Sequence, residues 1–183
     1  NVLKHGVIAR IGIKIKLPNG NYKVKFDPII RAELLQFQQS DPYFITRFKT
    51  MPTVQEDIDQ ELALVRMLAK QIVENSKTLL KNPKASLDAI QKGVSSDKLC
   101  DIVTNSLKIS ESQKFKYIET ASLNQRLTYL LEDIEKEKYM GQIENEINMT
   151  VKKNIDENQK EYYLREKMRA IQEELGDKAK KES

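Results

Sequence analysis

The chain has 183 residues, of which 39% are hydrophobic and 32% charged, and its formal net charge is +4. This length fits one ordinary domain, or a small domain with a long appendage. With one cysteine (Cys100) and one histidine (His5), the chain contains neither an internal disulfide nor a Cys/His zinc cluster, and no stretch approaches the ~20 apolar residues of a membrane span.

The first fifty residues have the pattern of β-structure. Residues 11–17 and 22–26 alternate between apolar and polar side chains, and a turn cluster, Pro18-Asn19-Gly20-Asn21, separates them. Residues 30–37 and 43–49 are two further predicted strands. Four strands in series predict a small antiparallel sheet or barrel. Because Asn1 directly precedes strand-like sequence, we expect residues 1–50 to be the C-terminal part of a β domain in a longer protein.

This β part is basic, with nine Lys or Arg against three acidic residues. Alternation places four lysines on one face of the predicted hairpin: Lys14, Lys16, Lys23 and Lys25. Such a face could bind phosphates of a nucleic acid. The favoured interpretation is a solvated face, because no aromatic rings interleave with the lysines as base-stacking would require.

Residues 51–121 are predicted to form a helical subdomain. Thr53 and Glu56 have the spacing of a capping box, which predicts a helix from there to about residue 80. Shorter helices are expected over 83–92, ended by Gly93, and over 96–107. A second capping box at Ser110 opens another helix.

A third capping box at Ser122 begins a segment without proline that reaches Leu175. Gly176 then occupies the position of a C-terminal glycine. At 1.5 Å per residue this helix would be ~80 Å long. Leu164, Met168, Ile171 and Leu175 form a narrow apolar seam with coiled-coil spacing. We expect residues 122–176 to be one long helix and residues 177–183 to start a linker.

The sequence offers no catalytic, cofactor-binding or metal-binding constellation. A P-loop is absent because no Gly-Lys pair occurs. Cys100 lies among apolar residues and is interpreted as a core residue, and His5 as a strand-end residue. The expected class is therefore α+β: a small β-sheet or barrel, then a helical domain that ends in one very long helix, without enzymatic activity of its own.

Four segments resemble the Lon family of ATP-dependent proteases. Residues 159–176, QKEYYLREKMRAIQEELG, resemble the helix that precedes the ATPase module of that family. Asn124-Gln125-Arg126-Leu127 resembles the start of the same helix. Leu17-Pro18-Asn19-Gly20 resembles a hairpin turn of the family, and Arg31-Ala32 resembles a further strand motif. The resemblance covers nearly the whole chain in the right order.

The resemblance implies a homohexameric parent with an N-terminal substrate-engaging region, an AAA+ module that uses ATP and Mg²⁺, and a protease domain with a Ser-Lys dyad. This chain resembles only the first part. By resemblance, it is the substrate-recognition and hexamer-assembly region of a protease that degrades misfolded and regulatory proteins. The parent would act in the bacterial cytoplasm rather than the mitochondrial matrix. The alternative is a coiled-coil or nucleic-acid-binding scaffold without an attached protease.

Two sets of side chains are candidates for these contacts. Rings on the last two predicted strands are candidates for contact with unfolded or damaged proteins: Phe37, Tyr43, Phe44 and Phe48. The alternative is that these rings belong to the core. The long helix supplies candidates for contact with other copies and for the substrate entry: Tyr162, Tyr163, Leu164, Met168, Ile171 and Leu175.

Overall fold

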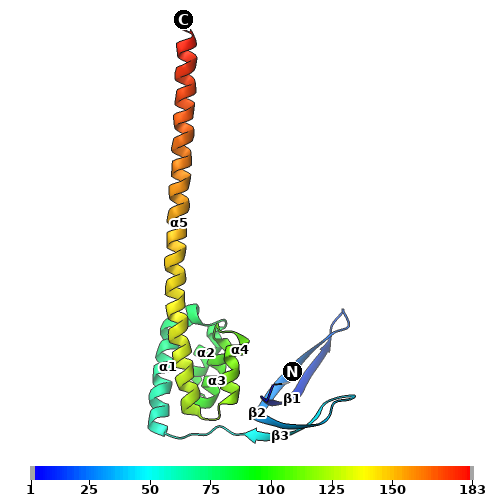
Figure 1. The fold of residues 1–183 in the computed structure, drawn as a ribbon. Coiled ribbons are helices and arrows are strands. Elements are labelled where there is room, and N and C mark those ends of the chain that lie inside the picture. Colours follow the sequence, from blue (N-terminus) through cyan, green and yellow to red (C-terminus); the bar gives the residue numbers. More distant parts are fainter. Residues whose placement is uncertain (1–2, 182–183) are drawn as a thin grey trace. The chain divides into compact units, whose positions relative to one another are not determined.

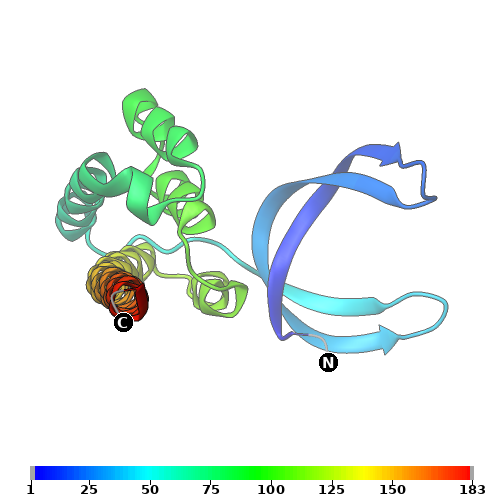
Figure 2. The same ribbon diagram turned by 90° about the horizontal axis from the view of Figure 1, so that it is seen from above.

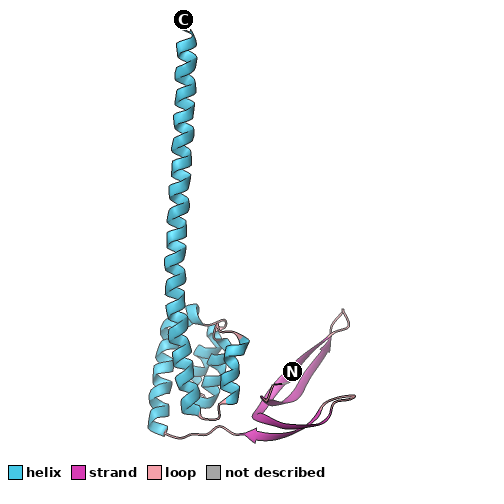
Figure 3. Cartoon of the chain, in the orientation of Figure 1, coloured by secondary structure: helices cyan, strands magenta, loops and turns pink. Residues whose placement is uncertain are grey.

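The structure is a computed structural model that describes the backbone of residues 3–181 and the side chains to residue 175. Three strands are followed by five helices (Figures 1 and 3). The elements are β1 (His5–Lys16), β2 (Tyr22–Gln39), β3 (Ile45–Met51), α1 (Ile58–Leu79), α2 (Pro83–Lys92), α3 (Ser96–Ser106), α4 (Glu111–Glu119) and α5 (Leu123–Lys181). Two compact units are distinguished, Asn1–Glu137 and Lys138–Ser183, and each is described by itself. The α+β class expected from the sequence is confirmed.

The sheet is antiparallel with the order β1-β2-β3. The four predicted strands are three in the structure, because residues 22–26 and 30–37 belong to one continuous strand, β2. Pro28 does not interrupt this strand. It lies opposite Ala9 at a shift of register, where the missing N–H of proline is tolerated. Figure 2 shows β2 as the long curved strand that both hairpins share.

A second register shift, between Ile11 and Lys14, changes which side chains share a face of the β1–β2 hairpin. After the shift Lys14 lies opposite Val24, and Ile15 lies opposite Lys23. Directly opposed residues point to the same face. The prediction that the four lysines gather on one face is therefore wrong, since alternation counted through the bulge assigns the wrong face.

The helix after the sheet begins later than predicted. The N-cap of α1 is Asp57, whose side chain accepts a hydrogen bond from the backbone N–H of Gln60. Thr53 is not the cap, because the residues after Met51 continue as extended chain. The N–H of Val54 donates to Ala121 O at 2.9 Å, and the N–H of Leu123 donates to Val54 O at 2.9 Å. These bonds tie the start of α5 to the segment that leaves the sheet.

Several other helix boundaries agree with the sequence, but the end of α5 does not. Gly93 ends α2 with a left-handed backbone (φ 59°), a conformation that glycine adopts without steric strain. The capping box at Ser110 is complete: the hydroxyl accepts from the N–H of Gln113, and the Gln113 side chain accepts from the N–H of Ser110. Helix α5 continues to Lys181 and passes through Gly176, where the sequence had predicted its end.

The hydrophobic core lies among the helices of the first unit. All five helices contribute buried members, and those of α1, α3 and the beginning of α5 include Leu68, Ile72, Leu99, Cys100, Val103, Leu123, Leu127, Leu130 and Ile134. In the sheet, by contrast, Ala32 is the one buried hydrophobic residue among those described. The first turns of α5 therefore hold the helices together, and the sheet depends on its contacts with them. None of the described helices combines the length and the apolar character that a membrane crossing requires.

Candidate functional site

Five polar side chains form a network where the sheet meets the helices. Arg31 of β2 donates to Asp101 Oδ1 at 2.6 Å, and Arg126 of α5 donates to Asp97 Oδ1 at 2.6 Å and to Asp101 Oδ1 at 3.2 Å. The Thr53 hydroxyl accepts from both guanidinium groups, at 3.2 Å from Arg31 and 3.0 Å from Arg126. We call these five residues the junction network, because they join the sheet, the segment after it, α3 and α5.

The two arginine side chains of the junction network are less exposed than its two carboxylates, which are partly buried. The Arg126 side chain is 0% exposed and that of Arg31 12%, whereas Asp97 and Asp101 are 41% and 55% exposed. Burial raises the pKa of the Asp101 carboxyl, and the two guanidinium groups act in the opposite direction. A buried cation of this kind needs a counter-charge. The network therefore joins the sheet to the helices through paired charges.

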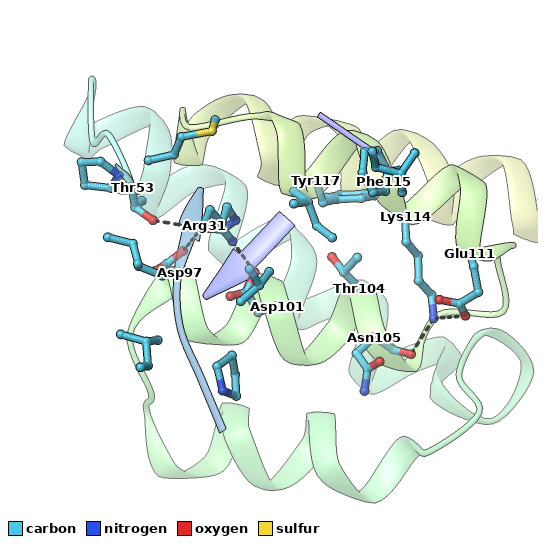
Figure 4. Close-up of a pocket in the computed structure, with 18 of the residues that line it drawn as sticks. Arg31, Thr53, Asp97, Asp101, Thr104, Asn105, Glu111, Lys114, Phe115 and Tyr117 are labelled. Atoms are coloured by element: carbon cyan, nitrogen blue, oxygen red, sulfur yellow. Dashed lines mark hydrogen bonds and ion pairs between the residues drawn. The ribbon is translucent and has the colours of Figure 1, made fainter. Parts of the chain in front are cut away.

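A groove of about 1100 Å³ lies beside the junction network, between the sheet and the helices α3 and α4 (Figure 4). Its apolar lining includes Val7 of β1, Ile29 of β2, Met51 of β3, and Phe115 and Ile118 of α4. Arg31, Asp97 and Asp101 line one part of the groove, and Glu111 and Lys114 line another. Lys114 donates to Glu111 Oε1 at 3.2 Å and to Asn105 O at 3.1 Å. The groove is thus apolar, with charged residues in two places.

Three of the four aromatic candidates lie at the far end of the β2–β3 hairpin, and the fourth, Phe48, lies in the middle of β3 opposite Leu34. Phe37 is on β2, Phe48 is on β3, and Tyr43 and Phe44 lie in the connection between them. All are exposed, by 41% (Phe37), 65% (Tyr43), 63% (Phe44) and 53% (Phe48). The rings of Phe37 and Phe44 meet edge to face, 5.5 Å apart. In this chain the four rings are therefore outside the core. We call these four residues the aromatic tip.

The candidates on the long helix lie in the second unit, and each is at least half exposed: Tyr162, Tyr163, Leu164, Met168, Ile171 and Leu175. At about 100° per residue, the last four side chains fall on one stripe of α5. Upstream, Ile147, Val151 and Ile155 are also exposed, but their stripe is rotated by about 120° from the later one. The two stripes therefore do not form one continuous seam.

The remaining reactive groups are buried or dispersed. Desolvation raises the pKa of the Cys100 thiol to about 12, so this thiol stays protonated and unreactive in the folded state. Among the described residues, no cluster of His, Cys, Asp or Glu side chains is suited to hold a metal ion. His5 Nδ1 lies 3.4 Å from Glu119 Oε1, a contact between β1 and α4.

The sequence did not predict the groove, but it singled out two residues of the junction network. Two motifs noted only for their resemblance, Arg31-Ala32 and Asn124-Gln125-Arg126-Leu127, supply both arginines of that network. The groove has no comparable signal, because its lining comes from five elements and the segments between them.

The comparisons with known proteins agree with one another over the length of the chain. Residues 1–136 match the family model of the ATP-dependent protease La (LON) substrate-binding domain. The chain is 40% identical over 183 residues to a Lon protease of Aster yellows witches'-broom phytoplasma, and 32% identical over 186 residues to one of Syntrophomonas wolfei. These alignments cover 100% of this chain but only 23% and 22% of the relatives.

Solved structures agree at the level of the fold. The N-terminal domain of a Lon protease from the Mycobacterium avium complex superposes with a TM-score of 0.61 at 17% identity, over 72% of this chain and 70% of that one.

Proposed function

The chain belongs to the Lon protease family, as its N-terminal substrate-binding domain, and on this premise we propose that it binds unfolded polypeptide through the aromatic tip. The observation that carries the proposal is the exposure of all four rings, 41–65%, on one hairpin. Large exposed apolar groups are typical of interaction sites, and aromatic rings supply much contact area with few rotatable bonds.

The strand next to the tip supports the same role. In the described part of the chain β3 is an edge strand, because the sheet order is β1-β2-β3. An edge strand carries unpaired backbone groups that can pair with an extended segment. An unfolded chain offers such segments irrespective of its sequence, and the rings beside the edge can hold its apolar side chains.

The test is binding of a fluorescently labelled, permanently unfolded protein to the 183-residue chain. Tyr43→Ser and Phe44→Ser together are expected to weaken binding about tenfold, from the loss of buried ring area. Tyr139→Ser is the matched control, since Tyr139 is 63% exposed but lies on α5, outside the tip. Equal affinity of the tip variant and the wild type would contradict the proposal.

We propose that the parent is an ATP-driven serine protease of the bacterial cytoplasm, with an AAA+ module using ATP and Mg²⁺ and a Ser-Lys dyad outside this chain. Its relatives are bacterial Lon proteases, and this chain spans less than a quarter of their length. The chain itself is expected to hydrolyse neither ATP nor peptide. ATPase activity that co-purifies with the 183-residue chain through successive columns would contradict this. The division of the lysines between two faces removes the main support for a nucleic-acid scaffold.

We further propose that the later stripe of α5 contacts other copies in a homohexamer, near the entry for substrates. Burying Leu164, Met168, Ile171 and Leu175 would stabilise contact by roughly 1.5–3 kcal/mol per side chain. Met168→Glu is expected to abolish concentration-dependent association in sedimentation. Met149→Glu is the control, because Met149 is 74% exposed but off the stripe. Association unaffected by Met168→Glu would count against this role.

A further inference from the structure

The groove between the sheet and the helices α3 and α4 keeps apolar groups in contact with water. Val7 is 46% exposed and Ile29 is 61% exposed, although both line a concave site together with Phe115. A volume of about 1100 Å³ is at the upper end of the range for ligand sites, and it accommodates several side chains of a peptide. An occupant with apolar side chains would therefore remove from water what the fold leaves exposed.

In the charged pairs of the groove, the carboxylate is more exposed to solvent than its cationic partner. The less exposed partner of each pair is the cation, Arg31 at 12% and Lys114 at 13% exposure, and the more exposed partner is the carboxylate, with Asp101 at 55% and Glu111 at 85%. Asp97 and Asp101 make their contacts within the junction network through Oδ1. Among the described residues this leaves Oδ2 of each open to a further donor.

A small polar side chain separates the two charged places. The Thr104 side chain of α3 lies between them, and its buried hydroxyl is beside the Cys100 thiol, with which it shares a hydrogen bond. Figure 4 shows Thr104 between Asp101 and Lys114.

From the exposed apolar lining and the exposed carboxylates we propose that the groove binds an extended polypeptide segment in which an apolar side chain is followed by lysine or arginine. This inference rests on the proposed function, and it names the class of segment that the domain selects. The apolar side chain packs against Ile29 and Phe115, and the cation reaches the free carboxylate oxygens of Asp97 and Asp101. A nucleic acid does not fit, because its phosphates would face these carboxylates. The aromatic tip, at the other end of β2, binds unfolded chain irrespective of charge.

The test uses the 183-residue chain and labelled peptides of equal length that share one apolar core and differ only in flanking residues: lysine, serine or glutamate. Fluorescence anisotropy is expected to show the lysine peptide binding about threefold more tightly than the serine peptide, as expected for partly exposed ion pairs, and the glutamate peptide most weakly. The preference for lysine is expected to shrink in high salt.

Variants locate the site. Ile29→Ser is expected to weaken the lysine peptide about tenfold, whereas Ile13→Ser, on an isoleucine that is 64% exposed outside the groove, leaves it unchanged. Asp97→Asn, which keeps Oδ1 as an acceptor for Arg126, is expected to reduce the lysine preference, and Glu74→Gln, on the exposed surface of α1, is its control. Circular dichroism of each variant establishes that it is folded.

The outcomes separate this inference from the proposed function. If labelled unfolded protein binds but the flanking charge and Ile29→Ser have no effect, the groove assignment is overturned and the aromatic tip proposal stands. If neither unfolded protein nor peptide binds, both are overturned. If Ile29→Ser changes sedimentation rather than peptide affinity, the groove is an interface between copies and the inference is wrong.

Discussion

Replacing Arg126 by methionine tests whether the junction network is held by charge balance or by the arginine itself. The change removes hydrogen bonds to Asp97, Asp101 and Thr53 but fills a similar volume. Hydrogen bonds to charged groups contribute roughly 1.5–3 kcal/mol each. The two carboxylates are 41% and 55% exposed and still have Arg31 as a cationic partner. Water can therefore hydrate them in the variant, which offsets part of the lost hydrogen-bond energy. We expect Arg126→Met to lower the free energy of unfolding by about 2 kcal/mol.

Removing the two carboxylates instead of the arginine is expected to destabilise the protein more. Asp97→Ala with Asp101→Ala leaves the Arg126 guanidinium, at 0% exposure, without a counter-charge. Stranding a buried charge costs about 3–5 kcal/mol. Adding Arg126→Met to this double variant is therefore expected to restore stability, because it removes the stranded cation.

Cys100 provides the assay. It is 0% exposed and the only thiol, so its rate of labelling in increasing urea reports opening of the core without a contribution from the exposed part of α5. The reasoning is refuted if Arg126→Met destabilises the protein more than the two alanines together. It is also refuted if Arg126→Met further destabilises the double variant.

Three further changes give sharp expectations. The pKa of Cys100 is raised from 9.0 to about 12 in the folded state, so above pH 9 ionisation of this thiol stabilises the unfolded state relative to the folded one. Between pH 8 and pH 10 the wild type should therefore lose about 1.4 kcal/mol more free energy of unfolding than Cys100→Ala. Equal losses in urea titrations of the two proteins would show that the thiol ionises within the folded structure. Gly141→Ala should stabilise α5 by about 0.5–1 kcal/mol, since the added Cβ meets nothing within 4 Å, and hydrogen exchange around residue 141 should slow. Ser110→Ala should cost about 1 kcal/mol through loss of the capping box, as measured by urea unfolding, whereas Ser112→Ala should cost less.

The sequence correctly predicted those helix boundaries that are determined by contacts within a few residues. Gly93 and the Ser110 capping box mark their helix boundaries through contacts within a few residues, and both are confirmed. The start of α1 was wrong because Thr53, which has the right spacing for a cap, is held instead by two arginines distant in sequence. Tertiary hydrogen bonds of this kind override a local signature.

The faces of the β1–β2 hairpin illustrate a different limit. Alternation predicts a face only while the register is regular, and the bulge between Ile11 and Lys14 inverts it. The alternation of apolar and polar residues does not predict a bulge. Gly12, at the position of the bulge, is the one residue that indicates it, because a glycine within a strand often marks a bulge or a close approach of the backbone. An added Cβ there would lie 3.1 Å from Asp27 Oδ2. The groove could not be predicted at all, because its lining is assembled from segments more than a hundred residues apart.

The near absence of buried residues in the sheet has a consequence for the order of events during synthesis. All strand pairing lies within His5–Met51, so both hairpins can form as soon as that stretch leaves the ribosome. Yet Ala32 is its one buried hydrophobic residue among those described, and the junction network to which Arg31 belongs is completed only by Arg126. Until residue 126 has emerged, the nascent strands have pairing partners but no packed support, and their exposed edges are open to other chains. The interval between these two points of translation is therefore the period in which the nascent chain most needs protection from aggregation.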